Sequence, residues 1–166
     1  MVMTKAELIG SLQNEVRILL HLASKVDRTK ADYRPTAKQR STLELLQYMS
    51  IMGPGLVAAI GGGAFNVEAW TAAEHAAKGR DFDQTVAAIN AQDYTALLGS
   101  MSDADFRSEI EMFGQKGSKG SMMVNMILSG YAAYRTQLFC YLKACGREDL
   151  STYNLWGGMD APVPAA

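Results

Sequence analysis

The sequence predicts an all-α protein, a four-helix bundle with one additional short helix, and three observations support this fold class. Four segments repeat apolar residues at steps of three and four, which is the pattern of an amphipathic helix. Two of them open with the spacing of a capping box, Thr4 with Glu7 and Ser41 with Glu44. No pair of segments alternates convincingly, so no sheet is expected. Because the chain has only 166 residues, 48% of them apolar, one domain over residues 1–166 is expected.

The first predicted helix begins after Thr4 and continues for about six turns. Its apolar stripe consists of Leu8, Leu12, Val16, Leu19, Ala23 and Val26. A polar stretch over residues 27–40, interrupted by Pro35, connects it to the second helix, which begins after Ser41. The inward residues of that second helix are Leu45, Met49 and Met52. The Pro54–Gly55 pair is expected to bend or end it, because proline lacks a backbone N–H.

The additional short helix is expected to begin after Asn66, its cap, and to stop at Gly79. Its distinctive side chains are Trp70, Glu74 and His75. Histidine can act as an acid or a base near neutral pH, so His75 is a candidate site residue. Most histidines on surface helices nevertheless have no such role.

Two further segments complete the predicted bundle. Asp81 is expected to cap a third long helix that ends near Gly99 and carries an apolar stripe formed by Phe82, Val86, Ile89, Tyr94 and Leu97. Residues 102–113 fit either a short helix or extended chain, and the glycine-rich residues 114–120 are expected to form a loop. The last long helix is expected over residues 121–145, with Gly146 as its stop.

The segment after the last helix, residues 147–166, is apolar but irregular. Leu155 and Trp156 are side chains that are rarely left in water. The segment is therefore expected to pack on the bundle or on a dimer partner.

Composition excludes several functional classes. A net charge of −1 gives no electrostatic reason to expect a nucleic-acid partner. Cys140 and Cys145, five apart on one helix, cannot form a disulfide. The N-terminus has no signal-peptide pattern, and the most apolar stretch, residues 43–65, is too interrupted to cross a membrane. A cytoplasmic protein without a membrane partner is expected.

Two stretches resemble the helix signatures of the DinB-like (YfiT-type) bundle family. Residues 41–48 (STLELLQY) resemble its second-helix signature. Residues 131–138 (YAAYRTQL), followed by Tyr141, Leu142 and Gly146, resemble its last-helix signature. The resemblance implies the bundle fold, and it implies homodimers, because the family commonly forms them.

The resemblance also implies a nickel or zinc site built from three histidines, one on the second helix and two on the last. Here those places are occupied by Tyr48, Tyr131 and Tyr134. A phenol has a pKa of about 10 and must lose a proton before it can bind a metal, whereas neutral imidazole need not. The chain has only two histidines in total, so a three-histidine site cannot be assembled elsewhere. No metal and no cofactor are therefore expected.

Two interpretations of the three tyrosines stay open. In the first, their rings fill the volume of a lost metal cavity and bond to one another or to buried water. Alternatively they line a pocket, with His75 nearby, that binds a small polar ligand. A separate hypothesis follows from relatives that are thiol-dependent transferases or isomerases: such chemistry without the usual metal, with these side chains as proton donors. A purely dimeric scaffold would instead have no cavity between the second and last helices.

Overall fold

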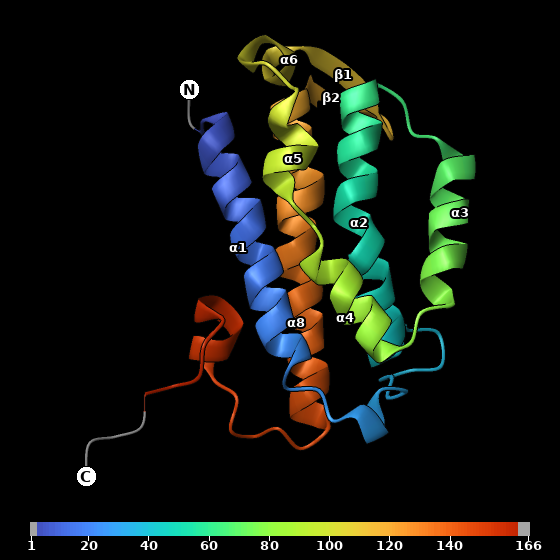
Figure 1. The fold of residues 1–166 in the computed structure, drawn as a ribbon, viewed down its shortest axis with the longest axis vertical. Coiled ribbons are helices and arrows are strands. Elements are labelled where there is room, and N and C mark those ends of the chain that lie inside the picture. Colours follow the sequence, from blue (N-terminus) through green and yellow to red (C-terminus); the bar gives the residue numbers. More distant parts are fainter. Residues whose placement is uncertain (1–2, 163–166) are drawn as a thin grey trace.

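The computed structural model describes residues 3–162 and confirms the all-α bundle (Figure 1). The bundle consists of α1 (Lys5–Ala23), α2 (Thr42–Gly62), α4 (Phe82–Asn90) followed by α5 (Tyr94–Gly99), and a last helix that ends with α8 (Ser129–Ala144). The shorter α3 (Val67–Lys78) stands outside the bundle against α2. One end is closed by α6 (Asp103–Arg107) and a hairpin of β1 (Glu109–Met112) and β2 (Gln115–Ser118). The other end carries the connection over residues 24–41, which includes a 3₁₀ turn at Arg28–Lys30.

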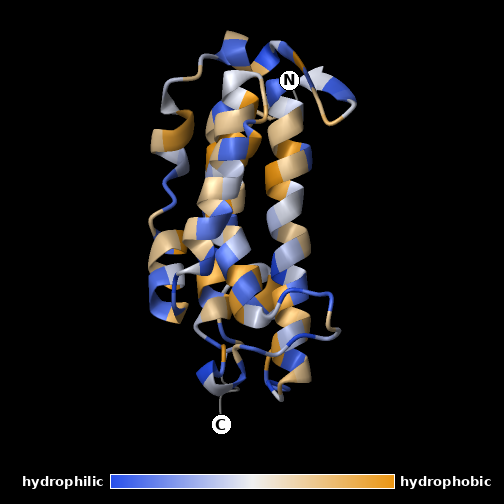
Figure 2. Cartoon of the chain, turned by 90° about the vertical axis from the view of Figure 1, so that its right-hand side faces the viewer, coloured by the Kyte–Doolittle hydropathy of each residue, from blue (hydrophilic) through white to orange (hydrophobic). Residues whose placement is uncertain are grey.

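The predicted starts of the capped helices are confirmed. Both capping boxes form, with Thr4 and Ser41 each accepting from the backbone N–H of the glutamate three residues later. Asn66 caps α3 in the same way. Behind these caps, hydrophobic and hydrophilic residues are interspersed along the long helices (Figure 2). Their apolar stripes meet in one core that includes Leu12, Leu19, Leu45, Met49, Ile127 and Leu138.

Helix α2 is long and apolar enough to cross a membrane by length and composition alone. However, 61% of its most apolar window is buried inside the bundle. Its apolar character is therefore explained by its place in the core, where it packs against α3, α4 and α8.

The second helix does not end at Pro54, because α2 continues to Gly62 with the proline inside it. Proline cannot donate to the carbonyl four residues before it, which is that of Ser50. In the structure the side-chain amide of Gln92 supplies this missing donor: its Nε2 lies 3.1 Å from the Ser50 oxygen and 3.0 Å from the Met49 oxygen. The helix can therefore pass through the proline with the freed carbonyl of Ser50 satisfied.

The single third helix expected between Asp81 and Gly99 is also wrong. The chain leaves α4 after Asn90, and α5 begins after a new cap, Asp93, whose carboxylate accepts from two backbone N–H groups of α5. The break turns Gln92 into the core, where only 4% of its surface remains exposed. The interruption is thus what delivers the donor that the second helix needs.

The chain also contains a β-hairpin, which its apolar pattern does not predict. β1 and β2 pair antiparallel, with Met112 opposite Gln115, and Phe113 and Gly114 form the turn with φ of 52° and 73°. Only two residues of β1, Ile110 and Met112, are buried, so the alternation is too short to distinguish from a loop. Residues 102–113, which fit either a short helix or extended chain by sequence, contain both: the short helix α6 is followed by the strand β1.

The last helix begins at Lys119, two residues before its predicted start, and continues without interruption to Ala144. Its segment Met123–Leu128 is wound as a π-helix. The buried residues of this segment, Met123 and Ile127, face the core.

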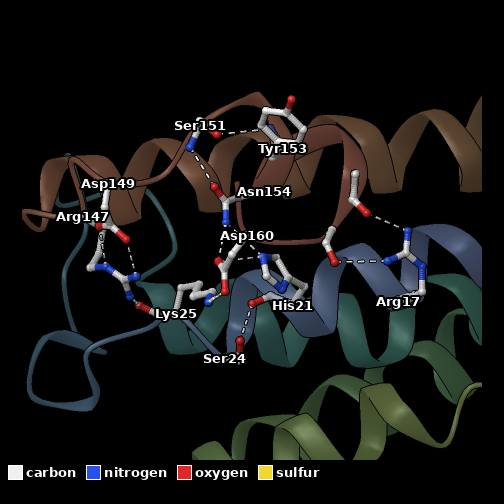
Figure 3. A network of polar contacts seen from close by, with 12 residues as sticks. Arg17, His21, Ser24, Lys25, Arg147, Asp149, Ser151, Tyr153, Asn154 and Asp160 are labelled. Atoms are coloured by element: carbon white, nitrogen blue, oxygen red, sulfur yellow. Dashed lines mark hydrogen bonds and ion pairs between the residues drawn. The ribbon is translucent and has the colours of Figure 1, made fainter. Parts of the chain in front are cut away.

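The described part of the C-terminal segment, residues 147–162, returns along α1 (Figure 1); residues 163–166 lie outside the described residues. Arg17 donates to the carbonyls of Gly157 and Gly158 at 2.9 and 3.1 Å. Asp160 accepts from Lys25 at 2.7 Å and from Asn154 at 2.9 Å (Figure 3). Trp156 remains 69% exposed, with Arg135 beneath its ring. Polar contacts with α1 are thus a large part of what holds the segment.

His21, in the same network, is expected to titrate below its usual pKa of 6.5. Partial burial is the main cause, Lys25 and Arg17 lower the pKa further, and Asp160, 3.7 Å away, raises it. Protonation of His21 therefore favours the unfolded state, so stability falls as the pH drops from 6.5 through the lowered value. In an NMR titration, Lys25→Gln should raise the His21 pKa and Asp160→Asn should lower it. Equal values in both variants would contradict this network.

Candidate functional site

A cavity of about 860 Å³ opens at the end of the bundle opposite the hairpin. Its walls are the connection over residues 28–41, the first half of α2 and the second half of α3. On the two helices it is lined by Leu43, Glu44, Gln47, Tyr48, Ile51, Glu74, Ala77 and Lys78. The volume lies within the range of natural small-molecule sites, roughly 300–1,000 Å³.

Tyr48 is the aromatic residue among those that line this cavity. Its ring contacts that of Tyr134 on α8 edge to face, with centroids 5.1 Å apart, and that of Trp70 on α3 at 6.2 Å. The guanidinium carbon of Arg40 lies 4.0 Å from the Tyr48 ring centroid. Burial and the neighbouring phenol of Tyr134 raise the pKa of Tyr48 to about 12, so its hydroxyl stays protonated at neutral pH and can donate a hydrogen bond.

Tyr131 belongs to a different set of contacts, although it lies only three residues from Tyr134. Its side chain is fully buried, its hydroxyl is 2.7 Å from that of Tyr94, and it donates to Oε1 of Gln92. Burial raises the pKa of Tyr131 and of Tyr94 above that of a free phenol. Within residues 3–162, no ring contact or hydrogen bond joins Tyr131 to Tyr48 or Tyr134. The structure therefore brings two of the three predicted tyrosines together and leaves the third in the core.

His75 does not join the tyrosines. It lies on the exposed side of α3 and, among the described residues, makes no side-chain hydrogen bond or ion pair. Its neighbour Glu74 lines the cavity instead. The carboxylate of Glu74 is close enough to Tyr48 to contribute to the raised pKa of that phenol.

Sequence reasoning missed Arg40 and the core partners of Tyr131. Arg40 comes from a polar connection that has no periodicity, so nothing in the sequence singled it out. A clearer signal existed at Gly53, a glycine inside a helix and directly before a proline. A Cβ at Gly53 would overlap the hydroxyl oxygens of Tyr94 and Tyr131, so only glycine allows these phenols to approach the α2 backbone.

The residues at the three expected ligand positions do not fit a divalent metal. Their donors are phenols, and burial makes the phenols of Tyr48 and Tyr131 harder to ionise than free tyrosine. The Tyr131 hydroxyl is moreover already engaged by Tyr94 and Gln92. Within the described chain, no group of three or more His, Cys, Asp or Glu side chains is placed to hold a metal ion.

Helix order, the peripheral α3 and the last helix together define an all-α bundle with the DinB-like fold. Among solved structures it is similar to the crystal structure of a DinB-like protein, YjoA, from Bacillus subtilis. The two share 17% sequence identity and superpose with a TM-score of 0.67 over 88% of this chain and 96% of that one. No protein-family profile and no curated protein sequence matches this chain. The structural likeness establishes the fold.

Proposed function

We propose that this protein is a metal-free DinB-like bundle that binds a small polar ligand in the cavity above Tyr48. The observation that supports the proposal is the cavity itself, about 860 Å³ in volume and lined by Tyr48, whose phenol stays protonated. Polar residues line it from three walls, namely Gln47, Glu74 and Arg40. The amide nitrogen of Gln47 donates to the carbonyl of Arg80 at 2.8 Å, whereas the Arg40 side chain donates no hydrogen bond within residues 3–162. A few polar groups around a partly apolar hollow are typical of a binding site.

Filling the cavity should abolish binding without unfolding the protein. Ala37 is exposed and lines the cavity from the connecting loop, so a tryptophan there would occupy the space without disturbing the core. In a thermal-shift screen of small polar metabolites, compounds that raise the Tm of the wild type should lose their effect in Ala37→Trp. The matched control is Ala104→Trp, on exposed α6 at the opposite end of the bundle, which should respond like the wild type.

Two outcomes would contradict the proposal. A ligand that stabilises Ala37→Trp as strongly as the wild type binds somewhere else. Near-stoichiometric nickel or zinc in the purified protein, lost on chelation together with several degrees of Tm, would contradict the metal-free part, because a bound metal stabilises the folded state.

The thiol-dependent transferase or isomerase stays a prediction. Of its four candidate proton donors, Tyr48 and Tyr134 are in contact with each other, whereas His75 lies on the exposed side of α3. The Tyr131 hydroxyl is buried and engaged in the core, so it is the least available of the four. Turnover of electrophiles with small thiols, compared between wild type and Tyr48→Phe, distinguishes this hypothesis from binding alone.

A further inference from the structure

Arg40 is an unusual side chain for a cavity wall. It immediately precedes Ser41, the cap of α2, and its guanidinium lies against the ring of Tyr48 with 4.0 Å from carbon to centroid. Among the described residues it forms no ion pair, and its side chain donates no hydrogen bond. A planar cation with five N–H donors is therefore held against an aromatic ring, beside a cavity, without an acceptor of its own.

The other basic residues of the cavity are not equivalent to Arg40. Arg28 donates to Asp83 at 2.8 Å, and Arg34 lies 3.1 Å from a carboxylate oxygen of Glu44. Both of those charges are already compensated.

Lys38 and Lys78 also line the cavity and, within residues 3–162, have no carboxylate partner. In all, five basic and three acidic residues line a cavity in a chain whose net charge is −1. The positive excess is therefore concentrated at this site, with Lys78 on the α3 wall and Lys38 and Arg40 on the loop wall.

The start of α2 does not supply this positive character. The N–H groups of Thr42 and Leu43 donate to the carbonyls of Tyr33 and Ala31, each at 2.9 Å. The next N–H, that of Glu44, donates to the Ser41 hydroxyl. With its free donors occupied and a glutamate in its first turn, the helix end has nothing left to offer an anion. Recognition of an anion must therefore come from side chains. Arg40 is the cavity residue that is both held against an aromatic ring and left with unbonded N–H donors among the described residues.

We propose that the ligand of this cavity carries an oxyanion, a carboxylate or a phosphate, and that Arg40 binds it through paired N–H donors. This inference rests on the proposed binding function. Contact with the Tyr48 ring restricts the guanidinium of Arg40, so less side-chain freedom is lost when the oxyanion binds. Tyr48 is then a positioning residue for Arg40, and Lys78 adds a second positive charge from the opposite wall.

The test uses probes that differ in charge but hardly in shape, benzoate and benzamide, together with inorganic phosphate. Each is titrated into the ¹⁵N-labelled full-length protein while backbone amide signals are followed. Benzoate and phosphate should move the signals of residues 40–51 and 74–78, and benzamide should bind at least tenfold more weakly. Arg40→Gln, which keeps hydrogen-bond donors but removes the charge, should weaken benzoate at least tenfold.

A matched control excludes a general effect of lowering the net charge. Arg107→Gln removes an exposed arginine on α6, at the other end of the bundle, and should bind benzoate like the wild type. Arg40→Lys should recover part of the affinity, since a lysine keeps the charge without the paired donors.

The possible failures are distinguishable. The oxyanion inference is overturned if benzamide binds as well as benzoate, if Arg40→Gln leaves benzoate binding unchanged, or if neither anion moves these signals. In each case the cavity can still bind neutral polar compounds, and that broader function fails only if Ala37→Trp leaves ligand stabilisation intact.

Discussion

Gln92→Leu should lower the free energy of unfolding by at least about 3 kcal/mol. Gln92 is buried, and it donates to the carbonyls of Met49 and Ser50 and accepts from the hydroxyl of Tyr131. Leucine has a similar size but would leave three buried polar groups each with one fewer partner. Each such loss costs about 1–3 kcal/mol. Urea denaturation followed by circular dichroism measures the difference.

Two further variants show whether Gln92 acts through Pro54. Gln13→Leu is a matched control, because exposed Gln13 also makes two side-chain hydrogen bonds, which water can replace; it should cost under about 1 kcal/mol. Pro54→Ala restores a backbone N–H that can donate to the Ser50 carbonyl. In the Gln92→Leu background this substitution should recover about 1 kcal/mol more stability than it does in the wild type. Strict additivity of the two substitutions would show that Gln92 does not compensate for the proline.

Arg135→Met should destabilise the protein by about 3–5 kcal/mol, because it leaves Glu15 as an unpaired buried charge. The two side chains are 5% and 11% exposed, with Nε of Arg135 2.6 Å from the carboxylate of Glu15. Arg135 also donates to the carbonyl of Leu155 and lies beneath the ring of Trp156, so its loss should loosen the C-terminal segment. Chemical denaturation gives the energy, and amide exchange of residues 153–160 gives the local effect.

The charge explanation predicts a specific rescue. Glu15→Leu combined with Arg135→Met removes both charges and should recover at least half of the lost stability. Arg17→Met, which removes an exposed arginine that also binds carbonyls of the C-terminal segment, should cost no more than about 1 kcal/mol. A double variant as unstable as Arg135→Met alone would show that packing, and not the buried charge, is responsible.

Local chemistry explains which parts of the fold could be predicted from the sequence. The capping residues Thr4, Ser41, Asn66 and Asp81 bond to backbone groups within three residues, so their pattern is visible in the sequence. Continuation of α2 through Pro54 depends on Gln92, which lies 38 positions further along the chain. No local pattern contains that information, and the same long-range contact accounts for the missed break in the third helix.

The candidate site was predictable only in part. Tyr48 and Tyr134 are in contact, as neighbouring helices of this bundle allow. Three residues along a helix correspond to a rotation of about 300°, so Tyr131 and Tyr134 are neighbours that point about 60° apart. That rotation places one phenol in the core and the other, partly buried, beside Tyr48. Spacing alone identified the shared stripe but not the different surroundings.

The placement of the cavity has an evolutionary consequence. Two of its walls, the loop over residues 28–41 and the outlying α3, are scarcely represented among the most buried side chains, which come mainly from the bundle. Replacing the exposed residues of those walls should therefore disturb the folding of the scaffold little, whereas Ser41 and Ala77 are buried. Natural selection can adjust what is recognised at this end of the molecule at little cost in foldability, whereas Gly53, Gln92 and Tyr131 have to change together or stay as they are.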